Sequence, residues 1–186
     1  RHRVDDWESV TMSNPTLTAL VATMLAVTGV AQTPDWTQVT TANSPSGRYG
    51  LPATYDSGRG TVVVFGGNYN GPLDGTWEYD GVDWTQITTT INPGARFRHE
   101  MVYDSDRGKA VMFGGLGSSH LNDTWEYDGV DWTQVTPASI PAARLFPAMT
   151  YDSARQKVVM FGGLASSIHF TDTWEYDGGA PPTVHP

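Results

Sequence analysis

The hydrophobic positions of the chain fall in short β-type runs that are separated by turn residues. In the middle of the chain these runs are Phe97–Tyr103, Lys109–Phe113, Thr124–Tyr127 and Trp132–Thr136. The letters between them, DSDRG, GGLGSSHLND and DGVD, are rich in Gly, Asp and Asn, which supply positive φ angles and side-chain turn bonds. Four short strands with hairpin-length links predict one antiparallel sheet, and no helical periodicity interrupts them.

This four-run unit occurs three times. When residues 35–82 are laid over residues 83–130, 25 of 48 positions are identical, and a third copy covers residues 131–178 with one residue inserted near Ile168. Each copy opens with DWTQ and continues through P-x-x-R, YDS, FGG and TWEYDG. A single sheet cannot bury both of its faces, but stacked copies can, so the repeated words are predicted to be scaffold.

A 48-residue unit with a Gly-Gly doublet after its second strand resembles the kelch repeat. The pairs Trp77/Trp84 and Trp125/Trp132 keep the kelch spacing of six intervening residues, and P-x-x-R precedes the first strand. The resemblance implies an all-β, kelch-type β-propeller with one four-stranded blade per repeat and the first strand nearest the channel. In the third copy Pro181 stands where the second Trp is expected, so a partial propeller whose last blade is incomplete is predicted. Its outer blades would leave two sheet faces uncovered.

Residues that recur in every copy are expected to be structural. The Trp residues would fill the gaps between blades, the Gly pairs would turn the chain where a Cβ would clash, and the P-x-x-R arginines would bond backbone carbonyls between blades. The recurring Glu of TWEYDG would be a strand-face or cross-strand partner. The structural set is Trp77, Trp84, Trp125, Trp132, Trp174, Gly66, Gly67, Gly114, Gly115, Gly162, Gly163, Arg48, Arg96 and Arg144.

The chain before the repeats has a different character. Thr16–Ala31 is uncharged and mostly apolar, is shorter than the about 20 residues of a membrane span, and ends in small residues before Gln32. Residues 1–31 are therefore predicted to be a signal peptide or upstream segment with a hydrophobic helix; a buried helix or an uncleaved anchor is the alternative. Residues 32–178 hold the repeats, and residues 179–186 form a truncated tail.

These features predict an exported protein, extracellular, at the cell surface or periplasmic. The chain resembles a fragment of a bacterial exported kelch-type protein, with further blades or domains expected beyond residue 186. No membrane span is expected in the mature form.

Composition narrows the classes of function. The net charge is −9 without a cluster of Lys and Arg, which argues against binding to nucleic acid. The chain has no Cys, which excludes disulfides, thiolate metal sites and the Tyr–Cys copper-radical site of galactose oxidase, a kelch-type enzyme. No cofactor, metal site or catalytic residue is predicted.

The three copies differ most in two windows, the segment before the first strand and the loop after FGG. In kelch propellers these open on one face that commonly binds partners, so a non-catalytic protein- or glycan-binding scaffold is predicted. The alternatives are drift in unused loops, a purely structural surface segment, and part of a carbohydrate-active, sialidase-like catalytic propeller. The ligand-binding residues predicted from these windows are Tyr69, Arg98, His99, His120, Phe146 and His169.

Overall fold

A computed structural model describes residues 33–179 of the chain. The expected hydrophobic helix at Thr16–Ala31 and the tail at 180–186 lie outside the described residues. The chain divides into two units, residues 1–38 and 39–186, and all of the strands belong to the second. Within the described residues no helix is long and apolar enough to cross a membrane.

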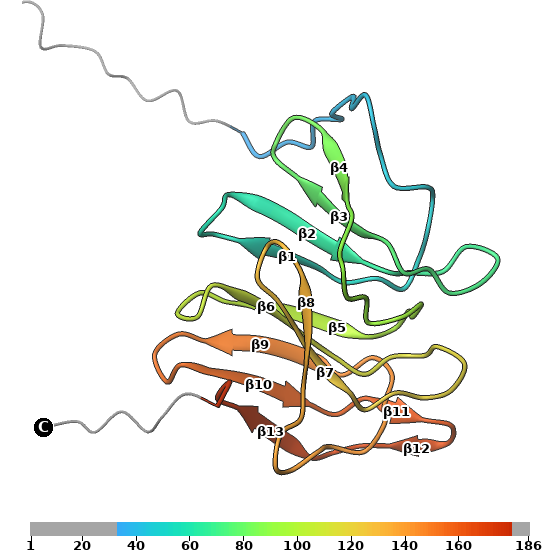
Figure 1. The fold of residues 1–186 in the computed structure, drawn as a ribbon, viewed down its shortest axis with the longest axis vertical. Coiled ribbons are helices and arrows are strands. Elements are labelled where there is room, and N and C mark those ends of the chain that lie inside the picture. The colour runs from blue at the N-terminus through green and yellow to red at the C-terminus, as the bar shows by residue number, and fades with distance from the viewer. Residues whose placement is uncertain (1–32, 180–186) are drawn as a thin grey trace, which may run out of the picture. The chain divides into compact units, whose positions relative to one another are not determined.

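Three antiparallel sheets, stacked one on the next, make up the second unit (Figure 1). The first sheet contains β1 (Ala53–Asp56), β2 (Thr61–Phe65), β3 (Thr76–Tyr79) and β4 (Trp84–Ile87) in that order. The second contains β5 (Glu100–Asp104), β6 (Lys109–Phe113), β7 (Thr124–Tyr127) and β8 (Trp132–Val135). The third contains β9 (Ala148–Asp152), β10 (Lys157–Phe161) and β13 (Thr173–Tyr176), and a small separate hairpin pairs β11 (Leu164–Ala165) with β12 (Ile168–His169).

This architecture confirms the all-β class and the partial kelch-type propeller. Each sheet lies within one repeat, and its strands pair in chain order. The first strands of successive blades lie side by side, β1 against β5 and β5 against β9, as expected for the strands nearest a propeller axis. Among residues 33–179, no strand pairs with the outer edge of β13, so the last blade has three strands.

The Trp of the fourth strand links its blade to the preceding one. Trp132 is fully buried, and its ring lies 5.1 Å from that of Phe65 in the first blade. Its indole N–H donates to the hydroxyl of Thr76, 2.9 Å away. Tyr127 packs on the other side, with ring centroids 5.0 Å apart. The core between the first two blades is therefore built around one indole ring.

A ladder of charged and phenolic groups forms a second link between blades. Arg59 binds Asp56 and Glu78 of its own blade, each at 2.7 Å. Tyr127 of the next blade then donates its hydroxyl to Glu78 at 2.8 Å. The next pair of blades repeats the arrangement, since Tyr176 donates to Glu126 at 2.7 Å. The Glu of TWEYDG, expected to serve within its own sheet, thus also joins two blades.

The turn that follows TWEY in each repeat carries a Gly. A Cβ on Gly129, which has a φ of 95°, would lie 2.6 Å from Nε of Arg59 in the preceding blade. The counterpart Gly178 would clash with Arg107 in the same way. Gly81 in the first blade has open space around it. All three turns have a positive φ that favours glycine, and at Gly129 and Gly178 a side chain would also clash with the preceding blade.

The P-x-x-R arginines anchor the start of each blade. Arg96 is buried and donates to the carbonyl of Gly114 at 3.2 Å and to both oxygens of Asp123 at 2.7 and 2.9 Å. The carbonyls that these guanidinium groups reach belong to their own blade, which differs from the expected bonds between blades. At this position the bond between blades is made by the backbone of the arginine instead: the N–H of Gly67 donates to the carbonyl of Arg96 at 2.9 Å.

The Gly pairs lie where two blades meet. Gly114 has a φ of 70°, and a Cβ there would lie 2.8 Å from the carbonyl oxygen of Arg144 in the next blade. Gly115 donates its N–H to that same carbonyl at 3.0 Å. Only glycine combines this backbone conformation with such a close approach.

Replacing Gly75 with Asp is expected to stabilise the first blade. Asp123 accepts hydrogen bonds from Arg96 and from the indole N–H of Trp125, whereas the first repeat has Gly75 at this position. A Cβ on Gly75 would lie 3.1 Å from Nε1 of Trp77, whose N–H would donate to the new carboxylate. The added charged hydrogen bonds should raise the free energy of unfolding by about 1–2 kcal/mol in urea.

Gly75→Ala is the matched control. It removes the same backbone freedom from the unfolded chain but adds no carboxylate. If Gly75→Ala stabilises the protein as much as Gly75→Asp does, the gain does not come from the acid and this prediction is wrong.

Candidate functional site: the loop face

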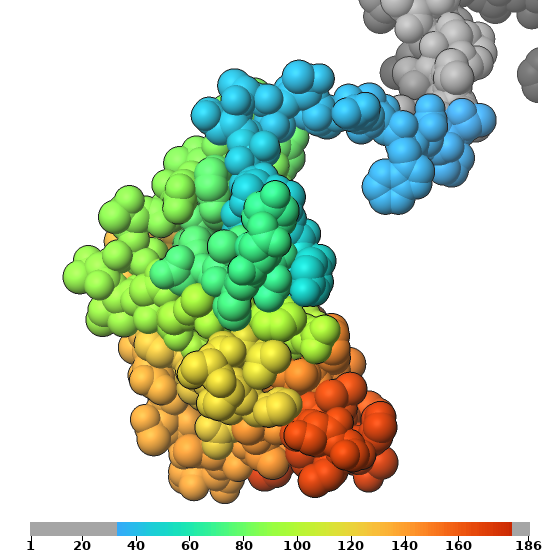
Figure 2. Space-filling view, turned by 90° about the vertical axis from the view of Figure 1, so that its right-hand side faces the viewer, coloured from blue at the N-terminus to red at the C-terminus, as the bar shows by residue number. Residues whose placement is uncertain are grey.

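The two windows in which the copies diverge lie at one end of the blades. We call this end the loop face; it comprises residues 49–52, 97–100 and 145–148 and the loops 66–75, 114–123 and 162–172. Isolated bridges join each first window to the second: Tyr49 to Asn68, Phe97 to Leu116, and Leu145 to Leu164. Figure 2 looks onto this end and shows the three loops side by side.

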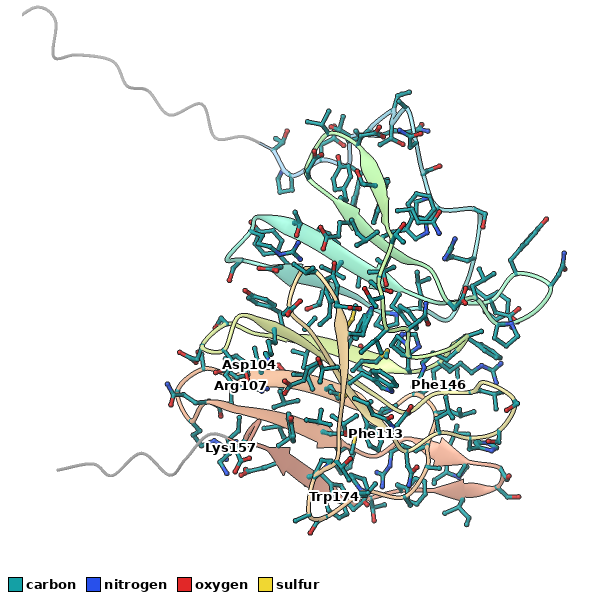
Figure 3. All side chains as sticks on the ribbon, viewed as in Figure 1. Asp104, Arg107, Phe113, Phe146, Lys157 and Trp174 are labelled. Carbon is teal, nitrogen blue, oxygen red and sulfur yellow. The ribbon has the colours of Figure 1, made fainter. Side chains whose placement is uncertain are left out.

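The opposite end carries the hairpins at 57–60, 105–108 and 153–156, which we call the turn face. Asp104 and Arg107 lie there, whereas Phe146 lies at the loop face (Figure 3). In the first hairpin the carboxylate of Asp56 accepts the N–H groups of Gly58 and Arg59, both at 3.0 Å. The carboxylate of Asp56 therefore caps its hairpin turn.

A left-handed backbone position recurs at the loop face in each blade. Gly50, Arg98 and Phe146 have φ angles of 68°, 60° and 51°. They are joined in series, because the N–H of Arg98 donates to the carbonyl of Gly50 at 2.6 Å and that of Phe146 to Arg98 at 2.8 Å. A non-glycine residue costs about 1–2 kcal/mol in this conformation. Two of the three blades thus hold a large side chain where glycine is favoured, a kind of strain that clusters at functional sites.

Arg98 and Phe146 belong to a partly exposed aromatic and cationic cluster. The guanidinium carbon of Arg98 lies 4.9 Å from the ring centroid of Phe97 and 5.1 Å from that of Phe146. Tyr49 packs edge-on against Phe97, with centroids 6.0 Å apart. Phe146 is 52% exposed, so the cluster presents apolar area together with a positive charge. We call Tyr49, Phe97, Arg98 and Phe146 the loop-face cluster.

The structure separates the six residues predicted to bind a ligand. It brings Arg98 and Phe146 together, whereas Tyr69, His120 and His169 lie on three successive loops, with Tyr69 61% exposed and His169 exposed. His99 is 3% exposed and lies beneath this surface, so the site proposed below is built without it. Within residues 33–179, no group of three His, Asp or Glu side chains is arranged to hold a metal ion.

His99 is a buried imidazole with no hydrogen-bond partner on either nitrogen. It packs against the ring of Phe65, 5.9 Å away. Burial, followed by the nearby Arg96 guanidinium, lowers the pKa of His99 from 6.5 to about 3. The other copies have Leu51 and Pro147 at this position, which fits an apolar environment.

Acidification is expected to destabilise the protein through His99. Below pH 6.5 the unfolded chain binds a proton that the native state excludes, so stability falls as the pH drops from 6.5 toward 3. Between pH 7 and pH 5 this group should remove ~2 kcal/mol from the free energy of unfolding. His99→Leu, the residue of the first copy, should abolish that part of the pH dependence. Urea unfolding of both proteins at the two pH values tests this, and equal losses would refute it.

Sequence reasoning missed two features of this arrangement. Tyr49 belongs to the loop-face cluster although no role was assigned to it, and Tyr127 and Tyr176 carry the hydrogen bonds between blades. Recurrence in every copy could have identified the second pair, since Tyr follows the Glu in each TWEYDG. Burial, followed by the Glu78 carboxylate, raises the pKa of Tyr127 well above 10, which keeps its hydroxyl a proton donor.

The fold and the loop face define a β-propeller assembled from repeats, with a constant frame and variable tips. The family model described as the KLHDC2/KLHL20/DRC7 Kelch-repeats domain matches residues 22–179. The chain therefore belongs to the kelch-repeat family and is a repeat-based interaction scaffold. A comparison with curated proteins found no match.

Proposed function

We propose that the protein is an exported, non-catalytic binding module that holds a protein partner at its loop face, with a glycan as the alternative ligand. The observation that carries the proposal is the loop-face cluster, in which Arg98 and Phe146 occupy left-handed backbone positions that glycine fills in the first blade. Because a non-glycine residue in this conformation lowers stability, the presence of Arg98 and Phe146 indicates that their side chains have a role that glycine would not serve.

The composition of the surface supports binding by contact. Exposed Phe146, Tyr49 and Tyr69 supply aromatic area, and Arg98 supplies a planar cation held between two rings. Aromatic residues and Arg are enriched at the energetic centres of protein interfaces. The net charge of −9 should favour neutral or basic partners.

Arg98→Gly separates binding from folding. It removes the side chain and also the left-handed strain, so the free energy of unfolding should stay the same or rise by about 1 kcal/mol. Capture of the partner should weaken by about 1 kcal/mol or more. Ser105→Ala on the turn face is the control and should leave both quantities unchanged. Pull-down from secreted proteins and a glycan array, run side by side, identify the class of ligand.

The proposal fails if Arg98→Gly and Phe146→Gly bind normally while Ser105→Ala abolishes capture, because the site would then lie on the turn face. Capture of a glycan alone would replace the protein partner with the alternative ligand. Turnover of that glycan would favour the alternative of a carbohydrate-active catalytic propeller.

Export is the second part of the proposal. It rests on the uncharged, apolar stretch Thr16–Ala31 and the small residues before Gln32. Expression from Met12 in a bacterium should give a secreted protein whose N-terminus lies near Gln32. Retention at full length in the cytoplasm would contradict export and leave the proposed binding surface untouched.

A further inference from the structure

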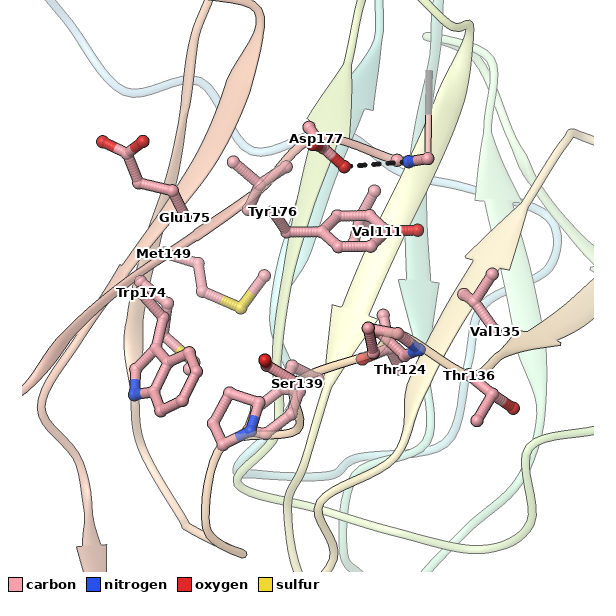
Figure 4. A pocket seen from close by; sticks show the side chains of 18 residues that line it. Val111, Thr124, Val135, Thr136, Ser139, Met149, Trp174, Glu175, Tyr176 and Asp177 are labelled. Carbon is pink, nitrogen blue, oxygen red and sulfur yellow. Dashed lines mark hydrogen bonds between the residues drawn. The ribbon is translucent and has the colours of Figure 1, made fainter. Parts of the chain in front are cut away.

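A cavity of about 530 Å³ lies between the second and third blades (Figure 4). Phe113, Thr124 and Tyr176 are among its lining residues. These are the counterparts, one repeat further along the chain, of Phe65, Thr76 and Tyr127, the three residues that contact Trp132 between the first two blades. The cavity is therefore lined by the same residue types that contact the Trp132 indole.

The site is present because one strand is absent. In the first two blades a DWTQ strand pairs with the outer edge of TWEY, as β4 does with β3 and β8 with β7. Within residues 33–179 the equivalent edge of β13 pairs with no strand. We call the cavity and this edge together the Trp slot. A cavity of about 150 Å³ already accepts benzene, so the slot has room for an indole.

One DWTQ motif, at residues 35–38, belongs to none of the three blades. Asp35–Val39 reads DWTQV, identical to Asp131–Val135, which forms β8 and its preceding turn residue. Trp36 is 99% exposed, whereas Trp132 is 0% exposed. The family match begins at residue 22 and so includes this segment in the repeat domain.

The segment after Asp35–Val39 is held in the same way as the segment that connects β4 to the second blade. The N–H of Asn43 donates to the carboxylate of Asp83 at 2.8 Å. Forty-eight residues later, the N–H of Ile91 donates to Asp131 at 2.9 Å. Ile91 lies just beyond β4, so residue 43 is held as it would be if a fourth strand of a preceding blade came before it.

We propose that the Trp slot is filled by Asp35–Val39 of a second copy of this chain. The register follows from β3 and β4, where Thr76 pairs with Ile87 and Tyr79 with Trp84. By analogy Val39 of one copy pairs with Thr173 of the other, and Trp36 pairs with Tyr176. The Trp36 indole then donates to the hydroxyl of Thr124 as Trp132 does to Thr76. This inference concerns the faces between blades and does not depend on the ligand of the loop face.

The outer faces of the stack are complementary in the same way. The first blade presents Tyr79 and Trp84, packed 5.2 Å apart like Tyr127 and Trp132, together with the unobstructed Gly81. The third blade presents Phe161, 53% exposed, where Phe65 and Phe113 are buried. Glu175 is likewise exposed where Glu126 is buried.

Docking the first blade of one copy on the third blade of another repeats an interface that the chain already makes between its own blades. Tyr79 would donate to Glu175, and Trp84 would cover Phe161. Two such contacts, related by a twofold axis, would join two copies, and twofold dimers are the commonest oligomers.

Sedimentation of the full chain tests the dimer. We expect a species of twice 20.2 kDa, and Trp36→Ala should weaken dimerisation at least tenfold with an unchanged circular dichroism spectrum, since Trp36 is 99% exposed. Tyr69→Ala, which removes another exposed aromatic ring from the loop face, is the control and should dimerise normally. A monomer at all concentrations, or a dimer unaffected by Trp36→Ala, would overturn the proposal.

Engineered cysteines test the register. The natural chain has no Cys, so a Val39→Cys, Thr173→Cys double variant can form disulfides only between these positions. Oxidation should give a covalent dimer on a non-reducing gel. The matched control is Gln38→Cys with Thr173→Cys, which moves one thiol to the opposite face of its strand and should crosslink poorly. Equal crosslinking of both variants, or a disulfide within one chain, would refute the proposed pairing.

Discussion

Trp132→Ala is expected to lower the free energy of unfolding by about 3–5 kcal/mol. The side chain is fully buried, packs against Phe65 and Tyr127, and donates to the hydroxyl of Thr76. Its loss opens a cavity between two blades and leaves a buried hydroxyl without its donor. Urea unfolding at pH 7 measures the change.

Trp84→Ala is the natural comparison, because Trp84 occupies the same position in the first blade. It is half-buried and packs on Tyr79, and among residues 33–179 no preceding blade lies against it. At a protein concentration below that at which copies associate, its replacement should cost about half as much as that of Trp132 or less. Equal costs would mean that Trp stabilises its own sheet and not the contact between blades.

Arg96→Ala is expected to destabilise the second blade by about 3 kcal/mol or more. The guanidinium is 1% exposed and binds Asp123 through both nitrogens, so truncation leaves a partly buried carboxylate without its counter-ion. Breaking a buried ion pair from one side typically costs about 3–5 kcal/mol. In the native protein, burial opposes ionisation of Asp123, but the bonds from Arg96 and Trp125 outweigh it and lower its pKa.

Arg48→Ala supplies the control for this measurement. Arg48 is half-buried and donates to the carbonyl of Gly66 at 2.9 Å, but Gly75 stands where its Asp partner would be. Its loss should cost only about 1 kcal/mol, the value of an ordinary hydrogen bond. If the two variants are equally destabilised, the Asp partner contributes little. We expect that adding Asp123→Asn to Arg96→Ala recovers part of the lost stability. No recovery would likewise mean that the Asp partner contributes little.

The Trp slot connects these measurements to assembly. The contacts made by Trp132 are those that we propose for Trp36 of a second copy, so Trp36→Ala should reduce stability only where copies associate. Stability that rises with protein concentration in the natural chain and not in Trp36→Ala is the expected pattern.

The sequence alone determined the frame of this protein. The 48-residue period, the turn chemistry and the paired Trp residues were sufficient to predict three blades, their strands and, among residues 33–179, a third blade of three strands. This was possible because each blade buries the same face against its neighbour, so the same packing residues must recur at the same spacing. The positions that recur in every copy therefore predicted the fold, and the windows that differ between copies predicted the location of the loop face.

Only the tertiary structure decided how individual side chains are used. His99 and Phe146 lie in equivalent windows, yet the first is buried without partners and the second is exposed beside Arg98. Strand direction and the left-handed position before each strand set this difference, and neither is encoded in residue type. The contact of Tyr127 with Glu78 joins residues 49 positions apart in different blades, so it exists only once the sheets stack. The Trp slot likewise depends on the tertiary structure. Its cavity lies between the second and third blades, at the position that Trp132 fills between the first and second.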